Sequence, residues 1–509
     1  MTALRNLHNS NPQHSNPRNL IALAAVCLSS MMFGLEISSV PASLPALERL
    51  LHGDFQDLQW VMNAYTIAVT SVLMAAGTLA DRFGRKRLFV ISLALFGATS
   101  LLCGLAGSMP AMIAGRFLQG AAGGVMLICQ VAVLTSQFND PAERVRAFAA
   151  WGVVFGIGLG FGPIIGSAIV ALASWQWVFL IHGPLALLTL ALAQYGAVES
   201  RDPQAERLDI GGMLTLSLAV LGTVFYITQG ADMGFTSQSA LAILLLSFAS
   251  LIAFVLIERR VAHPMFDFSV LRIREFSGAM FASAGMNVSF WPLMIYLPVY
   301  YHGVLGYDDV KAGWSLLAYT LPTLVVPPIA ERLAHRFQPG WVIPGGMFVI
   351  GAGFFLMLWG SAVDHASWLT LLPGCVLAGI GLGLTNTTVT NTSTAAVPAA
   401  RAGMASGIDM SARMISLAIN IAVMGLILLW GVAAALQGSD GGEKLQLAAS
   451  IASGRLGTDD PDGARAALVQ GFGWVLGYGG ISAWLFAAGS FLTFGAHRPV
   501  RPRLEAVQS

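Results

Sequence analysis

Long apolar stretches separated by short polar loops repeat along the whole chain. With a window of about 19 residues, six stretches precede residue 198, at 20–44, 58–79, 87–108, 111–135, 147–170 and 175–197. Two more lie at 210–230 and 238–257, and a last six at 276–302, 312–330, 341–361, 367–392, 404–433 and 474–496. A helix needs about 20 apolar residues to cross a bilayer. The pattern predicts an all-α integral membrane protein with fourteen transmembrane helices.

The spacing divides the chain into two six-helix halves with a two-helix insertion between them. We expect an N-terminal tail (1–19), an N-terminal half (20–198), a linker with the inserted hairpin (199–275), a C-terminal half (276–496) and a C-terminal tail (497–509). The segment 438–473 is rich in Gly, Ala and Asp, so we expect a solvated, partly ordered loop. The halves share a short repeat, LADRFG at 79–84 and LAHRFQ at 333–338, as in transporters built from related halves.

Composition supports a membrane protein. The chain is 56% hydrophobic and 10% charged, against roughly 25% charged in soluble domains. Cys27, Cys103, Cys129 and Cys375 all lie in apolar stretches without paired spacing, so we expect packing residues and neither a disulfide nor a metal site. The polar N-terminus has no cleavage pattern, which predicts that the first helix is retained.

Basic residues predict the orientation. If the N-terminus is cytoplasmic, twenty Lys and Arg residues fall on the inside and five on the outside. Cytoplasmic loops carry such an excess. We therefore expect a multi-pass protein of the cell inner membrane with both termini in the cytoplasm and the 438–473 loop facing outward.

Four charged residues clearly lie within apolar stretches: Glu36, Arg116, Asp409 and Arg413. Ionisable groups at membrane depth are costly and are by default functional. Glu36 should lie roughly 24 Å along its helix, in the outer half. There it could bind and release a proton, attract a cationic substrate, or be a carboxylate solvated at the outer mouth.

The other three charges have structural alternatives. Asp409 and Arg413 are four residues apart and can pair on one helix, so Asp409 is either half of a structural pair or a second proton carrier. Arg116 could face a cavity and influence a neighbouring carboxylate, or extend from a helix end to the membrane surface.

Two further patterns suggest segments that change conformation. The loop 77–87 (GTLADRFGRKR) places Asp81 and Arg85 at the cytoplasmic edge, where a carboxylate can meet a helix N-terminus or an Arg of the other half. Glycines four apart form two stripes, at 152, 156 and 160 and at 158, 162 and 166, which let another helix approach closely, and Pro163 adds a kink. The stripes suggest either a hinge or ordinary helix packing.

These motifs resemble the major facilitator superfamily, and within it the fourteen-span drug:proton antiporter branch. Gly77, Leu79, Asp81, Arg82, Gly84, Arg85 and Lys86 look like its loop 2-3 signature, and 35–45 (LEISSVPASLP) is similar to the first-span signature, with Glu36 for the usual Asp and Pro41 for Asn. Further matches are Arg116, Gln119, Gly120 and Gly123; Gly158, Gly162, Pro163 and Gly166; and 403–425 with Arg413. The resemblance implies a conformational latch at loop 77–87 and antiport rather than uptake.

The expected function is proton-coupled export of lipophilic, often cationic, drugs or toxic compounds. Alternatives are export of one natural product, or nutrient uptake. The chain has no GxxxxGK[ST] phosphate loop, so we expect no cofactor and a proton gradient as the energy source. Scattered histidines argue against an enzyme.

Cavity candidates are Gln119, Met286, Asn287, Phe290, Trp291 and Tyr296, although core or interface packing is the alternative for each aromatic residue. Expected partners are the substrate, protons and the lipid bilayer, with a periplasmic adaptor left open and no nucleic acid.

Overall fold

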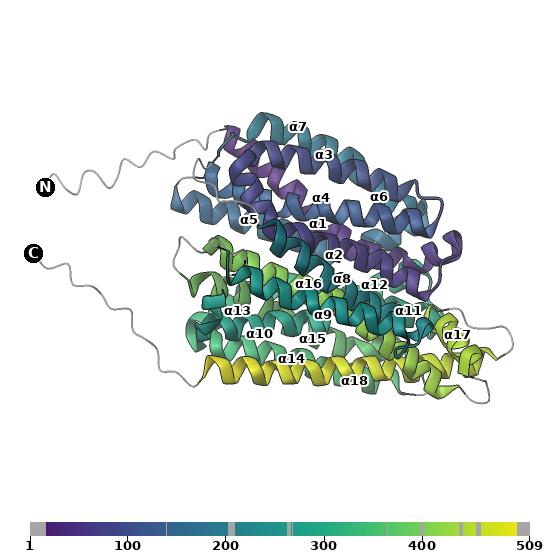
Figure 1. Ribbon diagram of the computed structural model, residues 1–509. Coiled ribbons are helices and arrows are strands. Elements are labelled where there is room, and N and C mark those ends of the chain that lie inside the picture. The colour runs from purple at the N-terminus through teal and green to yellow at the C-terminus, as the bar shows by residue number, and fades with distance from the viewer. Residues whose placement is uncertain are drawn as a thin grey trace, which may run out of the picture.

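The fold is built from helices throughout its described part (Figure 1). The computed structural model describes residues 17–138, 140–201, 209–261, 266, 268–363, 365–397, 402–436, 441–454 and 460–495. Within these ranges, 13 helical segments are long and apolar enough to cross a membrane. The predicted all-α membrane fold is therefore confirmed.

The first half of the chain forms α1 (Pro17–Leu51), α2 (Phe55–Phe83), α3 (Arg85–Gly104), α4 (Met109–Gln137), α5 (Pro141–Leu172), α6 (Gln176–Leu180) and α7 (His182–Gly196). Next come α8 (Ile210–Met233) and α9 (Gln238–Glu258), which pack on each other, while α8 also packs on α2 and α16 (Ala402–Ala435). The inserted pair of apolar stretches thus forms two helices beside the contact between α2 and α16.

The remaining elements are η1 (Phe268–Arg272), α10 (Arg274–Val288), α11 (Phe290–Gly303), α12 (Asp309–Val325), α13 (Pro327–Phe337), α14 (Pro339–Ser361), α15 (Trp368–Ala395), α16, α17 (Gly441–Ala452) and α18 (Pro461–Phe494). Three predicted helices are interrupted, and the first of them, 175–197, divides at Ile181 into α6 and α7. The break between α10 and α11 lies at Ser289, three residues before Pro292, which cannot donate the backbone bond that would continue the helix. Pro327 begins α13 in the same way after α12.

The segment 438–473 differs from the prediction. We expected a solvated segment over 438–473 and a last helix from residue 474, but α17 occupies part of this segment and α18 begins at Pro461. The added turns are packed, since Ala448, Ile451 and Leu468 are buried. Many of their residues are Gly and Ala, which pack closely but contribute little to a hydropathy window.

The most extensive contacts between the halves are those of α5 with α12 and of α2 with α16, and α1 also packs on α11. The start of α1 and the end of α18 lie at one end of the molecule, the terminal end, and α17 lies at the other, the α17 end (Figure 1). At the α17 end, Leu47 of α1 and Phe55 of α2 belong to the same buried apolar cluster as Tyr296 and Leu428 of the second half. The two halves therefore share a core at that end.

The short internal repeat has a structural counterpart. Gly84 follows α2 with φ +110°, and Gln338 follows α13 with φ +71°. Each residue links two antiparallel helices at the terminal end, and each adopts a conformation that favours glycine. The related sequences thus make related turns in the two halves.

Candidate functional site

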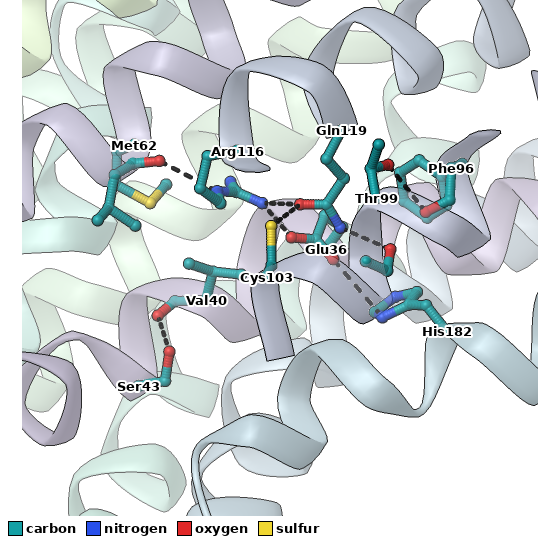
Figure 2. Close-up of polar contacts among 12 residues, drawn as sticks. Glu36, Val40, Ser43, Met62, Phe96, Thr99, Cys103, Arg116, Gln119 and His182 are labelled. Atoms are coloured by element: carbon teal, nitrogen blue, oxygen red, sulfur yellow. Dashed lines mark hydrogen bonds and ion pairs between the residues drawn. The ribbon is translucent and has the colours of Figure 1, made fainter. Parts of the chain in front are cut away.

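A buried polar cluster connects α1, α3, α4 and α7 (Figure 2). Arg116 donates through Nη1 to Oε1 of Glu36 and to Oε1 of Gln119, the latter at 2.6 Å, and through Nε to the carbonyl oxygen of Val61 at 3.0 Å. Gln119 in turn donates to the hydroxyl of Ser100 at 2.8 Å. The Glu36 carboxylate is thus held by a charge-assisted bond between two helices.

His182 lies on the other side of the carboxylate. Its Nδ1 is 3.5 Å from Oε2 of Glu36, and its Nε2 is 3.2 Å from the carbonyl oxygen of Met32. The edge of the imidazole packs on Phe96, with 5.7 Å between ring centroids. Figure 2 shows Glu36 between Arg116 and His182.

Aromatic rings complete the enclosure. The guanidinium of Arg116 lies over Tyr65, 4.3 Å from the ring centroid, and 5.8 Å from that of Phe179. Glu36 and Arg116 are both 0% exposed. Glu36 follows the start of α1 by nineteen residues, near the middle of the helix, which starts earlier and ends later than predicted. A position in the outer half of the membrane remains a prediction. The alternatives of a solvated carboxylate and of an arginine reaching the membrane surface are both wrong.

A second charged cluster lies in the other half, between α10, α15 and α16. Nε of Arg413 is 3.0 Å from Oδ1 of Asp409, which confirms that these two residues pair. The hydroxyl of Ser283 donates to the same carboxylate at 2.5 Å. Arg413 also donates to the side chains of Asn386 and Thr390. Asp409 and Arg413 are 2% and 7% exposed, so this pair, like Glu36 and Arg116, is buried.

The loop between α2 and α3 is held from two sides. Asp81 pairs with Arg85 in the same loop at 2.8 Å, rather than with an Arg of the other half or with a helix N-terminus. The N-terminus of α3 is instead capped by Glu199, which accepts from the backbone N–H groups of Lys86 and Arg87 at 3.2 and 3.1 Å. A Cβ on Gly84 would lie 2.6 Å from Oε1 of Glu199, so this cap needs glycine.

The other residues of the predicted latch lie around this cap. Gly77 is half-buried within α2, and Arg82 is exposed, with its guanidinium 5.6 Å from the Phe83 ring. The loop thus brings together residues of the predicted signature and Glu199. A latching role remains a prediction.

The two glycine stripes of α5 face different helices. Gly158, Gly162 and Gly166 face α1, where a Cβ on Gly158 would lie 2.7 Å from the carbonyl oxygen of Met31. The second stripe faces α12 of the other half, whose Thr320 hydroxyl donates to the carbonyl oxygen of Gly160 at 2.7 Å. The predicted close approach is confirmed, and α5 runs continuously through Pro163.

The remaining cavity candidates lie on both sides of the break at Ser289, with the aromatic ones on α11. Phe290 stacks on Tyr319 with ring centroids 3.9 Å apart, and Tyr296 donates to the carbonyl oxygen of Ile421. Met286, Asn287, Phe290 and Tyr296 are buried, Trp291 is half-buried, and Gln119 belongs to the Glu36 cluster. A role for these residues in substrate binding remains a prediction.

Comparison with known proteins identifies the family. The family model described as Major Facilitator Superfamily matches residues 26–421. The chain belongs to the major facilitator superfamily. This transporter is 30% identical over 417 residues to the puromycin resistance protein pur8 of Streptomyces alboniger, a match that covers 82% of the chain and 83% of the relative. It is 31% identical to the tetracenomycin C resistance and export protein of Streptomyces glaucescens, covering 80% and 75%.

A third relative is the multidrug resistance protein Stp of Mycobacterium tuberculosis, 29% identical, covering 83% of this chain and 78% of the relative. The fold is similar to that of a bacterial homologue of the human lysosomal transporter Spinster in an inward-facing, unoccupied conformation. That match has a TM-score of 0.66 and 14% identity and covers 94% and 98% of the two chains. The protein is thus a multi-pass membrane transporter of small molecules and not an enzyme.

Two residues of the transporter's polar sites were not predicted. His182 begins α7, and its sequence context contains no acidic neighbour that would mark it. Glu199 lies in the charged segment after α7, where the sequence predicted only the start of a linker. Both are recognised only when the fold brings distant segments together.

Proposed function

We propose that this transporter exports lipophilic, often cationic compounds in exchange for protons by alternating access. The observation that carries the proposal is the fully buried carboxylate of Glu36, bonded to Arg116 inside the N-terminal half. A charged group at membrane depth costs stability, and its usual role is to bind an ion or substrate during transport. An acidic residue that alternates between bonding to Arg116 and binding a proton can couple proton movement to substrate export.

The energy source in this proposal is the proton gradient rather than a bound nucleotide. Support comes from the drug resistance and export proteins among the relatives and from the absence of a phosphate-binding loop in the sequence. Asp409 is the second carboxylate available to a proton. Because it pairs within its own helix, we assign it to holding α10, α15 and α16 together.

The proposed topology has fourteen crossings. α2 is the crossing added to the 13 apolar segments, since it is 29 residues long and packs along α4 and α16. Two six-helix halves then flank the inserted pair α8 and α9, with the halves at 20–198 and 276–496. The excess of basic residues at the terminal end supports cytoplasmic termini in the cell inner membrane.

The test is efflux of ethidium from cells that express the chain, with and without collapse of the proton gradient. Glu36→Gln keeps the shape and the bond acceptor but cannot ionise, so gradient-driven efflux should fall at least about tenfold, a loss equivalent to about 1.4 kcal/mol. Asp462→Asn is the matched control, because Asp462 has a side chain 97% exposed. Both variants should reach the membrane in wild-type amounts.

Normal gradient-driven efflux by Glu36→Gln would refute the coupling role of Glu36. Efflux that is insensitive to the gradient in the unaltered transporter would refute proton antiport itself. In cells lacking the transporter, unchanged sensitivity to toxic compounds together with slower growth on a nutrient would favour uptake instead.

A second candidate is a dedicated exporter of one natural product. Two relatives are named for single antibiotics, puromycin and tetracenomycin C. Competition separates this candidate from multidrug export: a broad transporter is inhibited by several unrelated lipophilic cations, whereas a dedicated one responds to a single compound class. Onward transfer to a periplasmic adaptor would appear as efflux that depends on a second gene product.

A further inference from the structure

The position of the ring proton of His182 follows from its backbone contact. Nε2 lies 3.2 Å from the carbonyl oxygen of Met32, and a carbonyl oxygen only accepts hydrogen bonds. A neutral His182 therefore carries its proton on Nε2. Its Nδ1 then presents a lone pair, and this atom faces Oε2 of Glu36 at 3.5 Å.

These two facing atoms lack other hydrogen-bond partners among the described residues. Oε2 of Glu36 and Nδ1 of His182 are both buried polar atoms without a bond, while Oε1 of Glu36 is occupied by Arg116. Two lone pairs that face each other away from water are unfavourable. A single proton placed between them would satisfy both atoms.

No other described group forms a hydrogen bond with Oε2 of Glu36 or with Nδ1 of His182. Arg116 of α4 contacts the other carboxylate oxygen and stays charged. Tyr65 of α2 lies under the guanidinium, and Cys103 of α3 is directed to Gln119 at 3.7 Å. The Tyr65 hydroxyl and Nη2 of Arg116 are also buried, and neither bonds to Oε2 of Glu36 or to another described group. The α5 residues that face this stretch of α1 include glycines, so α5 contributes backbone atoms to the contact between the two helices. The ring of Phe179 comes from α6.

We propose that Oε2 of Glu36 and Nδ1 of His182 together form the proton-binding position of the transporter, with one exchangeable proton held between them. The proposal rests on the proposed proton-coupled export and names a second residue for it. When the proton arrives, it neutralises the carboxylate or charges the imidazole. In either case the net charge of Glu36, Arg116 and His182 together changes from zero to +1.

Proton binding would thereby affect the contact between helices. Glu36 lies on α1, Arg116 on α4 and His182 on α7, and α1 packs on both other helices. A carboxylate that shares a proton with His182 is a weaker acceptor for Arg116. The deprotonated state therefore favours the α1 to α4 ion pair, and the protonated state favours the α1 to α7 contact.

The experiment is a pH titration of full-length transporter in nanodiscs, followed by infrared difference spectroscopy with and without ¹⁵N-labelled histidine. Coupled groups titrate as a pair. The carboxyl band that disappears in Glu36→Gln and the histidine band that disappears in His182→Gln should change at one shared midpoint. His182→Gln, which keeps hydrogen-bonding atoms but cannot ionise in this range, should shift the carboxyl midpoint by about one pH unit or more.

His302→Gln is the matched control, because His302 also bonds a backbone carbonyl, that of Tyr307 at 2.8 Å, but lies outside the cluster on α11. It should leave the carboxyl midpoint unchanged. A carboxyl midpoint that is the same in His182→Gln and in the unaltered protein would overturn the shared position. So would a Glu36 that stays ionised while His182 stays neutral throughout the titration.

Transport provides the second readout. In proteoliposomes with ethidium and an imposed proton gradient, His182→Gln should lose the pH dependence of exchange while it retains ethidium binding. A merely structural role would lower binding and exchange together and would leave the pH profile unchanged, which contradicts the inference. Failure of the proposed function is distinguishable, because an unaltered transporter that does not move ethidium still yields the spectroscopic result.

Discussion

Both halves of the transporter bury a carboxylate with an arginine, but the two pairs differ in what they connect. Glu36 and Arg116 lie on α1 and α4, so forming or breaking their bond acts on the contact between two helices. Asp409 and Arg413 lie four residues apart on α16. Breaking the second pair would leave the helix itself in place, which is why we assign coupling to Glu36 and stability to Asp409.

Asp409→Asn should destabilise the protein rather than uncouple it. Arg413 is 7% exposed, and loss of its charge partner leaves a buried cation uncompensated, which costs about 3–5 kcal/mol in comparable sites. We expect a lower apparent melting temperature in detergent, partly restored in Asp409→Asn with Arg413→Gln. Efflux by the surviving protein should keep its dependence on the proton gradient. A normal melting temperature with uncoupled efflux would instead make Asp409 a proton carrier.

For single residues, the sequence predicts well which charged residues belong to the buried sites and poorly which residues surround them. Glu36, Arg116, Asp409 and Arg413 stand out because charge is rare within apolar stretches. His182 does not stand out, because histidine is common at helix ends and its partner Glu36 is distant in the sequence. The depth of Glu36 in the membrane remains a prediction, since it depends on a helix start that hydropathy locates only within a few residues.

Among the helices, α1 and α5 show how small residues set the approach of two helices. Gly34 and Gly158 face each other: a Cβ on Gly34 would lie 2.7 Å from the carbonyl oxygen of Phe155. The hydroxyl of Ser38 lies 3.1 Å from the carbonyl oxygen of Gly158, which adds a polar contact at the same level. This packing fixes α1, and hence Glu36, relative to the rest of its half.

Gly158→Val should separate these helices. Overpacking of a close contact costs about 1–3 kcal/mol or more, so we expect reduced amounts of folded protein and loss of ethidium efflux. Gly152→Val is the control on the same helix, because a Cβ at Gly152 meets nothing within 4 Å. Both variants are measured by fluorescence-detected size exclusion and by efflux. Equal behaviour of the two variants would contradict the role of close packing.

Helix positions were predictable where side chains are large and apolar, and less so where packing relies on small residues. The stretch 210–230 corresponds closely to α8, whereas α18 starts well before the predicted 474. The interruption at Ser289 was also missed, because a hydropathy window averages over the effect of Pro292. Where a helix starts or breaks thus depends also on proline and on glycine packing, which the apolar content of a window does not reveal.

On the scale of the whole molecule, the position of the shared core indicates which end is closed. Leu44 and Leu58 of the first half lie in one apolar cluster with Leu297 and Leu428 of the second, all at the α17 end. Met126 and Leu134 toward the terminal end of α4 belong to a separate cluster whose buried members all come from the first half, with the partly buried Met410 and Met414 of α16 packed against it. Alternating access requires the shared core at the α17 end to separate during each cycle.

A cross-link between α2 and α16 at this end should therefore stop transport. A Cβ on Gly425 would lie 2.6 Å from Cδ of Gln59, so Gln59 and Gly425 are in direct contact across the two halves. Oxidation of Gln59→Cys with Gly425→Cys should abolish ethidium efflux, and reduction should restore it. The single variants and the unaltered chain, which contains Cys27, Cys103, Cys129 and Cys375, control for oxidation elsewhere. Full efflux after complete cross-linking would mean that the halves stay joined at the α17 end, and export would then need a path that does not separate α2 from α16.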